Sequence, residues 1–230
     1  MNFTDPEKQT IKIPEKGFSL LELIIVLLVM MILVVLASRF TNPKLYKPDR
    51  QANIVNDVLK EAKHRAITQQ ETMRVELNRE KRYIRLVSEN DPGDSSDDKE
   101  IRRYPLALAQ DVIFETAPKN LDATPDEPTP VPELTFKTPV TAQVEDPNDK
   151  VATFRFLKNG NVVDAGFNSV GDGAVITGAT IYFWIPLLNQ DNTLSENAQM
   201  VRALTLIGSS GATRFWRCAV VNGRCTKWEK

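Results

Sequence analysis

The chain is poor in the residues from which most catalytic and metal sites are built. Its 230 residues include one histidine, His64, and two cysteines, Cys218 and Cys225, both near the C-terminus. No glycine-rich phosphate loop and no metal-ligand spacing is found, so the sequence predicts no catalytic constellation, no metal and no cofactor. His64 is expected on the solvent-facing side of a helix. We therefore predict that the protein is not an enzyme.

A strong net charge of either sign is also missing, but charge is unevenly distributed. The formal net charge of −1 gives no general reason to expect nucleic acid as a partner. Residues 88–149 nevertheless carry 15 acidic and 5 basic residues, whereas residues 200–230 carry 6 basic residues and 1 acidic residue. The basic C-terminal segment is therefore the candidate surface for any anionic partner.

One long hydrophobic run is present, from Phe18 to Ser38. At about 1.5 Å per residue, a helix of this length spans roughly 30 Å, the thickness of a bilayer core. Lysines before the run, at positions 8, 12 and 16, favour a cytoplasmic N-terminus. The alternatives are an uncleaved signal anchor and a signal peptide cleaved near Val35-Leu36-Ala37, although a signal peptide usually has a shorter apolar region of about 7–15 residues.

Glu22 places a carboxylate inside this run, where it costs a few kcal/mol and usually has a partner. If the chain is cleaved between Gly17 and Phe18, the new amino group lies just over one helical turn from Glu22. When such helices pack side by side with an axial stagger, the amine of one subunit reaches the carboxylate of its neighbour, and the two charges compensate each other. Glu22 is therefore expected to drive assembly and to set its axial register.

The stretch KGFSLLELIIVLLVMMIL resembles the N-terminal motif of type IV pilins and type II secretion pseudopilins. That motif has a basic leader, a glycine, a phenylalanine or methionine, and a glutamate at mature position five, which Gly17, Phe18 and Glu22 match. The resemblance implies cleavage after Gly17 by a prepilin peptidase and N-methylation of Phe18. It also implies a single-pass anchor in the bacterial inner membrane, a periplasmic C-terminal domain, and assembly with other pilins into a fibre.

The sequence after the membrane segment predicts an amphipathic helix followed by strands. Pro43 and Pro48 interrupt the first helix, and Asp49 can cap a new one that ends near Gln70. His64 lies on the polar face of this helix. The expected strands, the first of them half-buried, are 72–77, 82–87, one that ends at the Asn159-Gly160 turn, 180–185, 201–207 and 213–217.

These elements give a pilin-like α+β fold, in which a long N-terminal helix with a membrane half and an amphipathic half packs on antiparallel sheet. The expected parts are a leader at 1–17, an assembly helix at 18–40, an amphipathic helix at 41–71 and a β-rich domain at 72–230. LKEAKHRAITQQETMRVELNREKRYIRL resembles the FimT/GspH branch of the superfamily, in which such a helix passes directly into a strand hairpin. ATFRFLKNGNV and RALTLIGSSGATRFW are similar to later strands of that branch.

Two acidic insertions, 88–100 and 117–150, depart from the compact pattern of that branch. The second holds seven prolines, and both are expected to be solvated loops. Residues 133–136 of the second are the candidate for a short strand within it. A calcium site is the alternative, but the spaced D-x-D-x-D-G pattern is missing.

The two cysteines lie seven positions apart in a domain expected to be exported, so a Cys218–Cys225 disulfide is predicted. A turn at Asn222-Gly223 would place Val221 opposite Arg224 and Cys218 opposite Lys227. The two cysteines would then be diagonal, so the hairpin and the disulfide compete unless the strand bends. The resemblance to pilins, many of which have a C-terminal disulfide loop, also favours the bridge.

Two classes of function follow. The first is a structural subunit, a minor pseudopilin or minor pilin near the tip of a type II secretion pseudopilus or related fibre. The second is a FimT-like minor pilin that binds DNA during uptake, with Arg214, Arg217, Arg224 and Lys227 as the candidate contacts. Binders of that kind carry a GRxR motif, and here Gly223-Arg224-Cys225 is followed by Thr226 where the second arginine is expected. Strand alternation predicts Arg214 and Arg217 on opposite faces.

Overall fold

The computed structural model describes residues 19–40, 46–89, 98–106, 112–115, 117–118, 121, 124–127, 131, 136, 149–163, 176–188, 194–196, 200–221 and 224–230. Two compact units divide the chain, Met1–Pro43 and Lys44–Lys230. The first contains helix α1, Leu20–Phe40, and the second contains helix α2, Tyr46–Gln69, with all of the strands.

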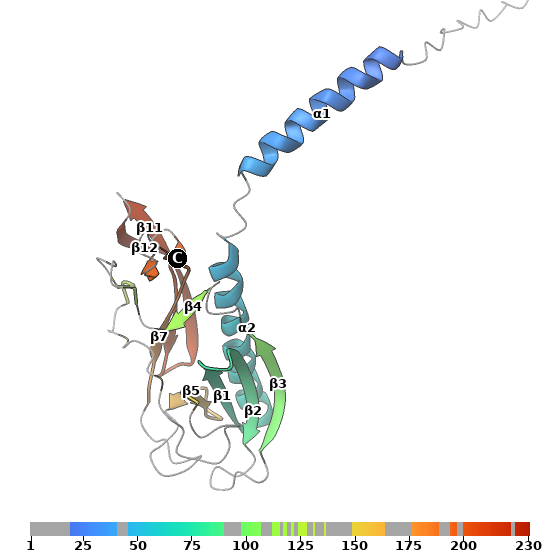
Figure 1. Ribbon diagram of the computed structural model, residues 1–230. Helices are drawn as coiled ribbons and strands as arrows, with labels where there is room; N and C mark the ends of the chain where they lie inside the picture. The colour runs from blue at the N-terminus through green and yellow to red at the C-terminus, as the bar shows by residue number, and fades with distance from the viewer. Residues whose placement is uncertain are drawn as a thin grey trace, which may run out of the picture. The chain divides into compact units, whose positions relative to one another are not determined.

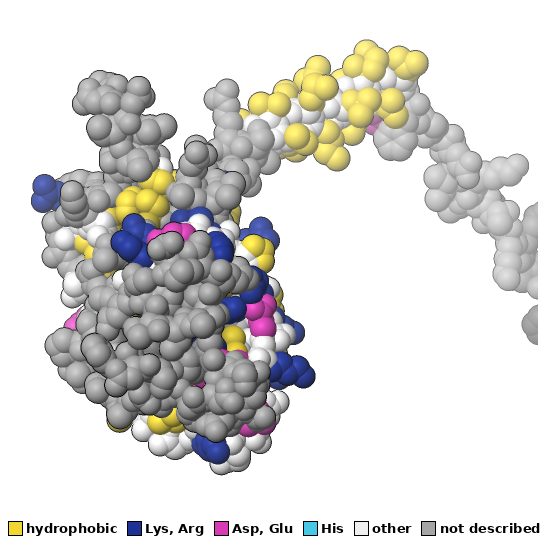
Figure 2. Space-filling model, turned by 60° about the horizontal axis from the view of Figure 1, so that its bottom comes forward, with side chains coloured by type: hydrophobic (Ala, Val, Ile, Leu, Met, Phe, Trp, Pro, Cys, Tyr) yellow, Lys and Arg dark blue, Asp and Glu magenta, His cyan; other side chains and the backbone are white. Residues whose placement is uncertain are grey.

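Helix α1 is apolar on every side. Its large hydrophobic side chains between Leu20 and Leu36 are 48% to 78% exposed, and Figure 2 shows them covering the described surface of the helix, with acidic atoms near one end only. A helix that is hydrophobic all round requires lipid or other apolar helices around it. No helix is both long and apolar enough to cross a membrane within the described residues, the side chains of α1 being described only as far as Leu36.

Helix α2 is amphipathic, as predicted, but it begins at Tyr46 instead of Asp49. Pro48 lies in its first turn, where the backbone N–H has no partner within the helix, so the proline does not interrupt it. Pro43 lies outside the described residues. The polar face carries His64, which is exposed as predicted. The buried positions of the helix are Pro48, Gln51, Ala52, Val55, Val58, Leu59, Ala62 and Ala66.

The strands form two five-stranded antiparallel sheets and a small two-stranded one (Figure 1). The first sheet has the order β3-β2-β1-β5-β6, and the second has the order β12-β11-β10-β7-β4. Strands of the first sheet are β1 (Thr72–Asn78), β2 (Tyr83–Glu89), β3 (Lys99–Pro105), β5 (Val151–Phe156) and β6 (Val162–Val163). Strands of the second are β4 (Ile113–Glu115), β7 (Ala179–Trp184), β10 (Arg202–Ile207), β11 (Ala212–Val221) and β12 (Arg224–Glu229). The small sheet pairs β8 (Pro186–Leu188) with β9 (Leu194–Glu196).

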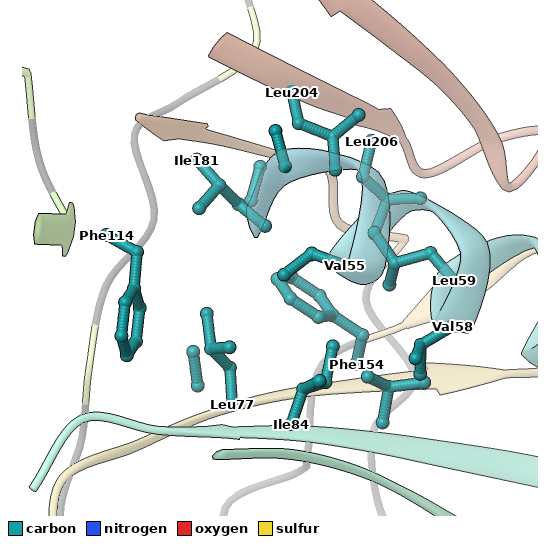
Figure 3. Packing of buried hydrophobic residues seen from close by; sticks show 14 of the residues in the cluster. Val55, Val58, Leu59, Leu77, Ile84, Phe114, Phe154, Ile181, Leu204 and Leu206 are labelled. Carbon is teal, nitrogen blue, oxygen red and sulfur yellow. The ribbon is translucent and has the colours of Figure 1, made fainter. Parts of the chain in front are cut away.

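The main core is built where α2 packs against both large sheets. Figure 3 shows Val55 and Leu59 of α2 between Phe154 of β5 and Leu204 of β10. Alternation along each strand directs one set of side chains toward the helix, which is the pattern that the sequence predicted. The predicted α+β class, with the amphipathic helix packed on antiparallel sheets, is therefore confirmed.

The other face of the first sheet differs from the prediction. β1 was expected to be half-buried, with its polar side chains in solvent, but all seven of its residues are buried. Arg74 donates to Glu76 at 2.6 Å and to Glu89 at 2.5 Å, while Arg155 donates to Glu89 at 2.8 Å. The prediction was wrong because other strands also supply partners: Glu76 pairs with Arg85 of β2, and Glu89 of β2 accepts from arginines of β1 and β5. Only paired charges can be buried this way.

These carboxylates also act on the arginines. Burial by itself lowers the pKa of the Arg74 guanidinium, but Glu76 and Glu89 more than offset this and raise the pKa above its ordinary value. The same holds for Arg85, where burial opposes ionisation and Glu76 raises the pKa. The arginines of this network are therefore firmly charged.

The acidic insertions are not solvated loops throughout. In the first insertion, Lys99 and Glu100 are exposed but belong to strand β3, and Glu89 is buried in β2. In the second insertion, Leu121 pairs in parallel with Cys225 of β12 and packs on the outer face of the second sheet. Phe136 packs against Phe114, with ring centroids 6.4 Å apart. The prediction of a solvated loop is wrong at Leu121 and Phe136, because the outer sheet face and the core edge offer apolar surface that these side chains bury.

Candidate functional site

The first candidate site is the start of helix α1. Ser19 precedes the helix, and its Oγ accepts a hydrogen bond from the backbone N–H of Glu22 at 3.2 Å. The S-x-x-E spacing is that of a capping box, which satisfies a backbone donor that has no partner in the first turn. Among the described residues no side chain pairs with the Glu22 carboxylate. Gly17 and Phe18 lie outside the described residues.

The second candidate site is the C-terminal hairpin formed by β11 and β12. The predicted disulfide joins Cys218 to Cys225, with 5.6 Å between their Cα atoms, a distance within the range that a disulfide spans. Val221 lies opposite Arg224, as predicted, but Cys218 lies opposite Trp228 and not opposite Lys227.

A bulge accounts for this difference in register. The pairing shifts between Ala219 and Val220, because Thr226 is an extra residue on β12. A bulge bends the strand that carries it and increases the local twist. The bend allows the hairpin and the disulfide to coexist, which a regular hairpin would oppose.

The hairpin has one apolar and one cationic face. Trp216, Cys225 and Trp228 are buried in a small cluster on the outer face of the second sheet, where Leu121 also packs. The face toward α2 carries Arg217, whose side chain is 63% exposed and whose Nε lies 3.6 Å from Asp49 Oδ1.

The four candidate anion contacts do not form one group. Arg224 and Lys227 are exposed and lie opposite Val221 and Ala219, which places them on the same face as Arg217. Arg214 points to the other face, as alternation predicted, and forms an ion pair with the buried carboxylate of Glu127. The structure thus places three of the four on one face of the hairpin, and the fourth forms an ion pair with the second acidic insertion.

Residues 14–38 match the prokaryotic N-terminal methylation motif. The motif marks a type IV pilin-like prepilin. It implies that a prepilin peptidase processes the chain, that α1 is anchored in the inner membrane before assembly, and that the prepilin assembles with other pilins. Proteins of this kind are generally not enzymes. No curated protein and no solved structure matches the prepilin.

Sequence reasoning missed two features of the prepilin. The bulge in β12 was not predicted: a regular hairpin was considered, and no local pattern in RCTKWE marks Thr226 as the extra residue. Asp49 was assigned only a capping role, yet it joins the start of α2 to the second sheet by pairing with Arg202 Nε at 2.7 Å. Nothing in the local pattern could show that pair, because its two residues are 153 positions apart.

Proposed function

We propose that the prepilin is a minor pseudopilin, or a closely related minor pilin, that is assembled through α1 near the tip of a type II secretion pseudopilus. The observation that carries the proposal is the surface of α1, which is apolar on all sides with one acid, Glu22, in its first turn. Such a helix finds its burial outside its own chain. The α+β domain then serves as the periplasmic part of the subunit.

Glu22 supplies the register of this assembly. Cleavage after Gly17 would leave the amino group of Phe18 at the head of α1, and methylation would leave it still able to carry a proton. In the apolar interior of a fibre, this amine and the Glu22 carboxylate of the adjacent subunit each lose water, and pairing offsets that loss. An axial shift by one turn would separate them, so the pair selects one stagger.

Cross-linking in cells tests this proposal. Glu22→Gln keeps the size of the side chain and removes its charge, so we expect membrane insertion to be retained while cross-links to partner pilins are strongly reduced. Asp57→Asn is the matched control, because Asp57 is an exposed acid on the polar face of α2. Cross-linking that is equal in all three proteins would show that the carboxylate has another role.

A second candidate function is DNA binding by a FimT-like minor pilin. The observation that favours it is the shared face of Arg217, Arg224 and Lys227, with Arg214 directed away to Glu127. Three phosphate contacts would lower log affinity by about 2.7 for each log unit of salt, at about 0.9 per contact. Fluorescence anisotropy of a labelled duplex with the full chain in detergent measures that slope. Absence of binding at low salt would leave the structural role alone.

A further inference from the structure

Part of the second acidic insertion covers the outer face of the second sheet, the face that points away from α2. We call the described residues of this part the strap, which comprises Ala117, Pro118, Leu121, Thr124, Pro125, Asp126, Glu127 and Val131. Leu121 pairs with Cys225 of β12 through one isolated bridge. Further along the strap, Glu127 forms an ion pair with Arg214 of β11. The strap is therefore held on more than one strand of this sheet.

The backbone of the strap contributes little to this attachment. A third contact is a long hydrogen bond, in which Thr180 Oγ1 of β7 donates to the carbonyl oxygen of Val131 at 3.5 Å. Residues 117–131 include four prolines, which have no backbone N–H to donate to a strand. A segment with so few hydrogen bonds to the sheet is expected to open at a lower free energy than the domain unfolds.

Buried polar atoms around the strap are left unsatisfied. The side chain of Glu127 is 4% exposed and uses only Oε2 in its pair with Arg214, whereas Oε1 has no hydrogen-bond partner among the described residues. The same is true of Trp216 Nε1, and of Thr205 Oγ1 on the strand position opposite Arg214. Burying a polar atom without a partner is unfavourable, so the strap covers this face imperfectly.

We propose that the outer face of the second sheet binds an extended acidic segment of a partner protein, which takes the place of the strap. The strap shows the chemistry that this face accepts. Its Leu121 packs in the cluster that contains Trp216 and Trp228, and a carboxylate reaches Arg214 from six positions further along. Strand β12 is the edge of this sheet in the described part of the chain, so an extended segment can add to it through its backbone.

A partner segment displaces the strap only if it binds the face better. The strap has the advantage of belonging to the same chain, which gives it a high effective concentration. A segment with fewer prolines has the advantage of backbone N–H and C=O groups, which can pair along β12 and satisfy Trp216 Nε1 and Thr205 Oγ1. The inference concerns the domain, so it goes beyond assembly through α1 and does not depend on it.

Fluorescence anisotropy of a labelled peptide with the sequence of residues 117–131 tests the proposal on the full chain in detergent. In the wild-type chain the strap competes, so the peptide should bind weakly. Glu127→Gln removes the carboxylate of the strap and leaves Arg214 for the carboxylate of the peptide, so we expect the affinity to rise at least about tenfold. Asp126→Asn is the matched control, because Asp126 is an exposed acid of the same strap, and it should leave the affinity unchanged.

Three further measurements identify where and how the peptide binds. Adding Arg214→Gln to Glu127→Gln should abolish the gain in affinity. A peptide with glutamine at the position of Glu127 should lose the gain in the same way. A peptide with threonine in place of its four prolines should bind more tightly than the first peptide, because it regains backbone donors for β12.

Each outcome decides the proposal. Equal affinity in wild type and Glu127→Gln, a gain that persists without Arg214, a gain with Asp126→Asn, or weaker binding of the threonine peptide overturns it. Faster amide exchange throughout β1 and β5 in Glu127→Gln also overturns it, because the strap would then be part of the fold and not a displaceable cover. Dimers of the wild-type chain that the peptide dissociates would make a second copy the occupant, and this overturns the assignment to a partner protein.

Discussion

Two glutamates in this molecule differ in how the chain compensates their charge. Glu89, at the end of β2, has a fully buried side chain that accepts hydrogen bonds from Arg74 at 2.5 Å and from Arg155 at 2.5 Å. Glu22 is exposed in the first turn of a helix whose other described side chains are apolar, and among the described residues only its backbone N–H has a partner, Ser19.

The difference separates folding from assembly. A buried carboxylate that pairs with two arginines, on β1 and β5, is part of the fold. Removing it leaves two cations inside the protein without a counter-charge. A carboxylate without a side-chain partner among the described residues, in an apolar helix, is one that another molecule could pair with. The same residue type therefore belongs to the folded domain at one position, and at the other we propose that it makes a contact between subunits.

The largest expected loss of stability comes from replacing the buried carboxylate of the domain, Glu89. Glu89→Gln should lower the free energy of unfolding of the domain by about 3–5 kcal/mol, because Arg74 and Arg155 lose the charge that compensates their burial. Glu22→Gln should leave that free energy unchanged. Urea unfolding of the full chain in detergent, followed by the fluorescence of the tryptophans in the second sheet, measures both. A loss below about 1 kcal/mol for Glu89→Gln would mean that the network is as weak as a surface ion pair.

A slightly smaller loss of stability is expected from a core substitution in α2, and none from the same substitution in α1. Leu59→Ala removes a side chain that is 1% exposed in the core beneath α2, and should cost about 2–5 kcal/mol of unfolding free energy. Leu27→Ala makes the same chemical change in α1, where the side chain is 60% exposed, and should not alter domain unfolding. Equal destabilisation by both variants would contradict the division into a folding helix and an assembly helix.

Much of this division could be predicted from the sequence, and the successes have a local origin. The helical period of Val55, Leu59 and Ala62 predicted α2, and strand alternation around Phe154 predicted β5, because each pattern reports a face that is buried. The N-terminal methylation motif could also be predicted, since Gly17, Phe18 and Glu22 lie within one short stretch, whereas the assembly role of Glu22 stays a prediction.

The failures have a non-local origin. The buried face of β1 depends on Glu89 and Arg155, which reach Arg74 and its neighbours only after three strands have paired. The role of Asp49 depends in the same way on Arg202. Charges read along one strand predict a solvated face, and only the partner strands show that the face is closed.

A moderate loss of stability is expected at the C-terminal hairpin, which is held by a disulfide instead of an ion pair. Replacing both cysteines, Cys218→Ser with Cys225→Ser, should lower the unfolding free energy by about 1–3 kcal/mol, because the closed loop is short. Reduction of the wild-type protein should give a similar loss. Mass spectrometry of non-reduced peptides checks the bridge, and free thiols in protein from the periplasm would refute it.

The smallest effect is expected at the exposed edge of the first sheet. The hydrogen bond from Arg103, only partly opposed by burial, lowers the pKa of the Glu100 carboxyl below its ordinary value. Since the folded pKa is the lower one, this stabilisation is present above the unfolded pKa and is lost as the pH falls through the folded pKa. The stability difference between wild type and Glu100→Gln should therefore shrink on acidification, and it should be small because solvent screens the pair. A difference that grows on acidification would reverse the assigned sign.

Mass spectrometry of the N-terminus of the mature protein from membranes tests the central claim most directly. If α1 is the assembly helix of a prepilin, the first residue is Phe18, and it carries the added mass of one methyl group. The amino group then lies just over one turn from Glu22, where it can pair with the carboxylate of an adjacent subunit. A mature chain that still begins at Met1, or one that begins at or after Ser38 and has lost the helix, would contradict the account.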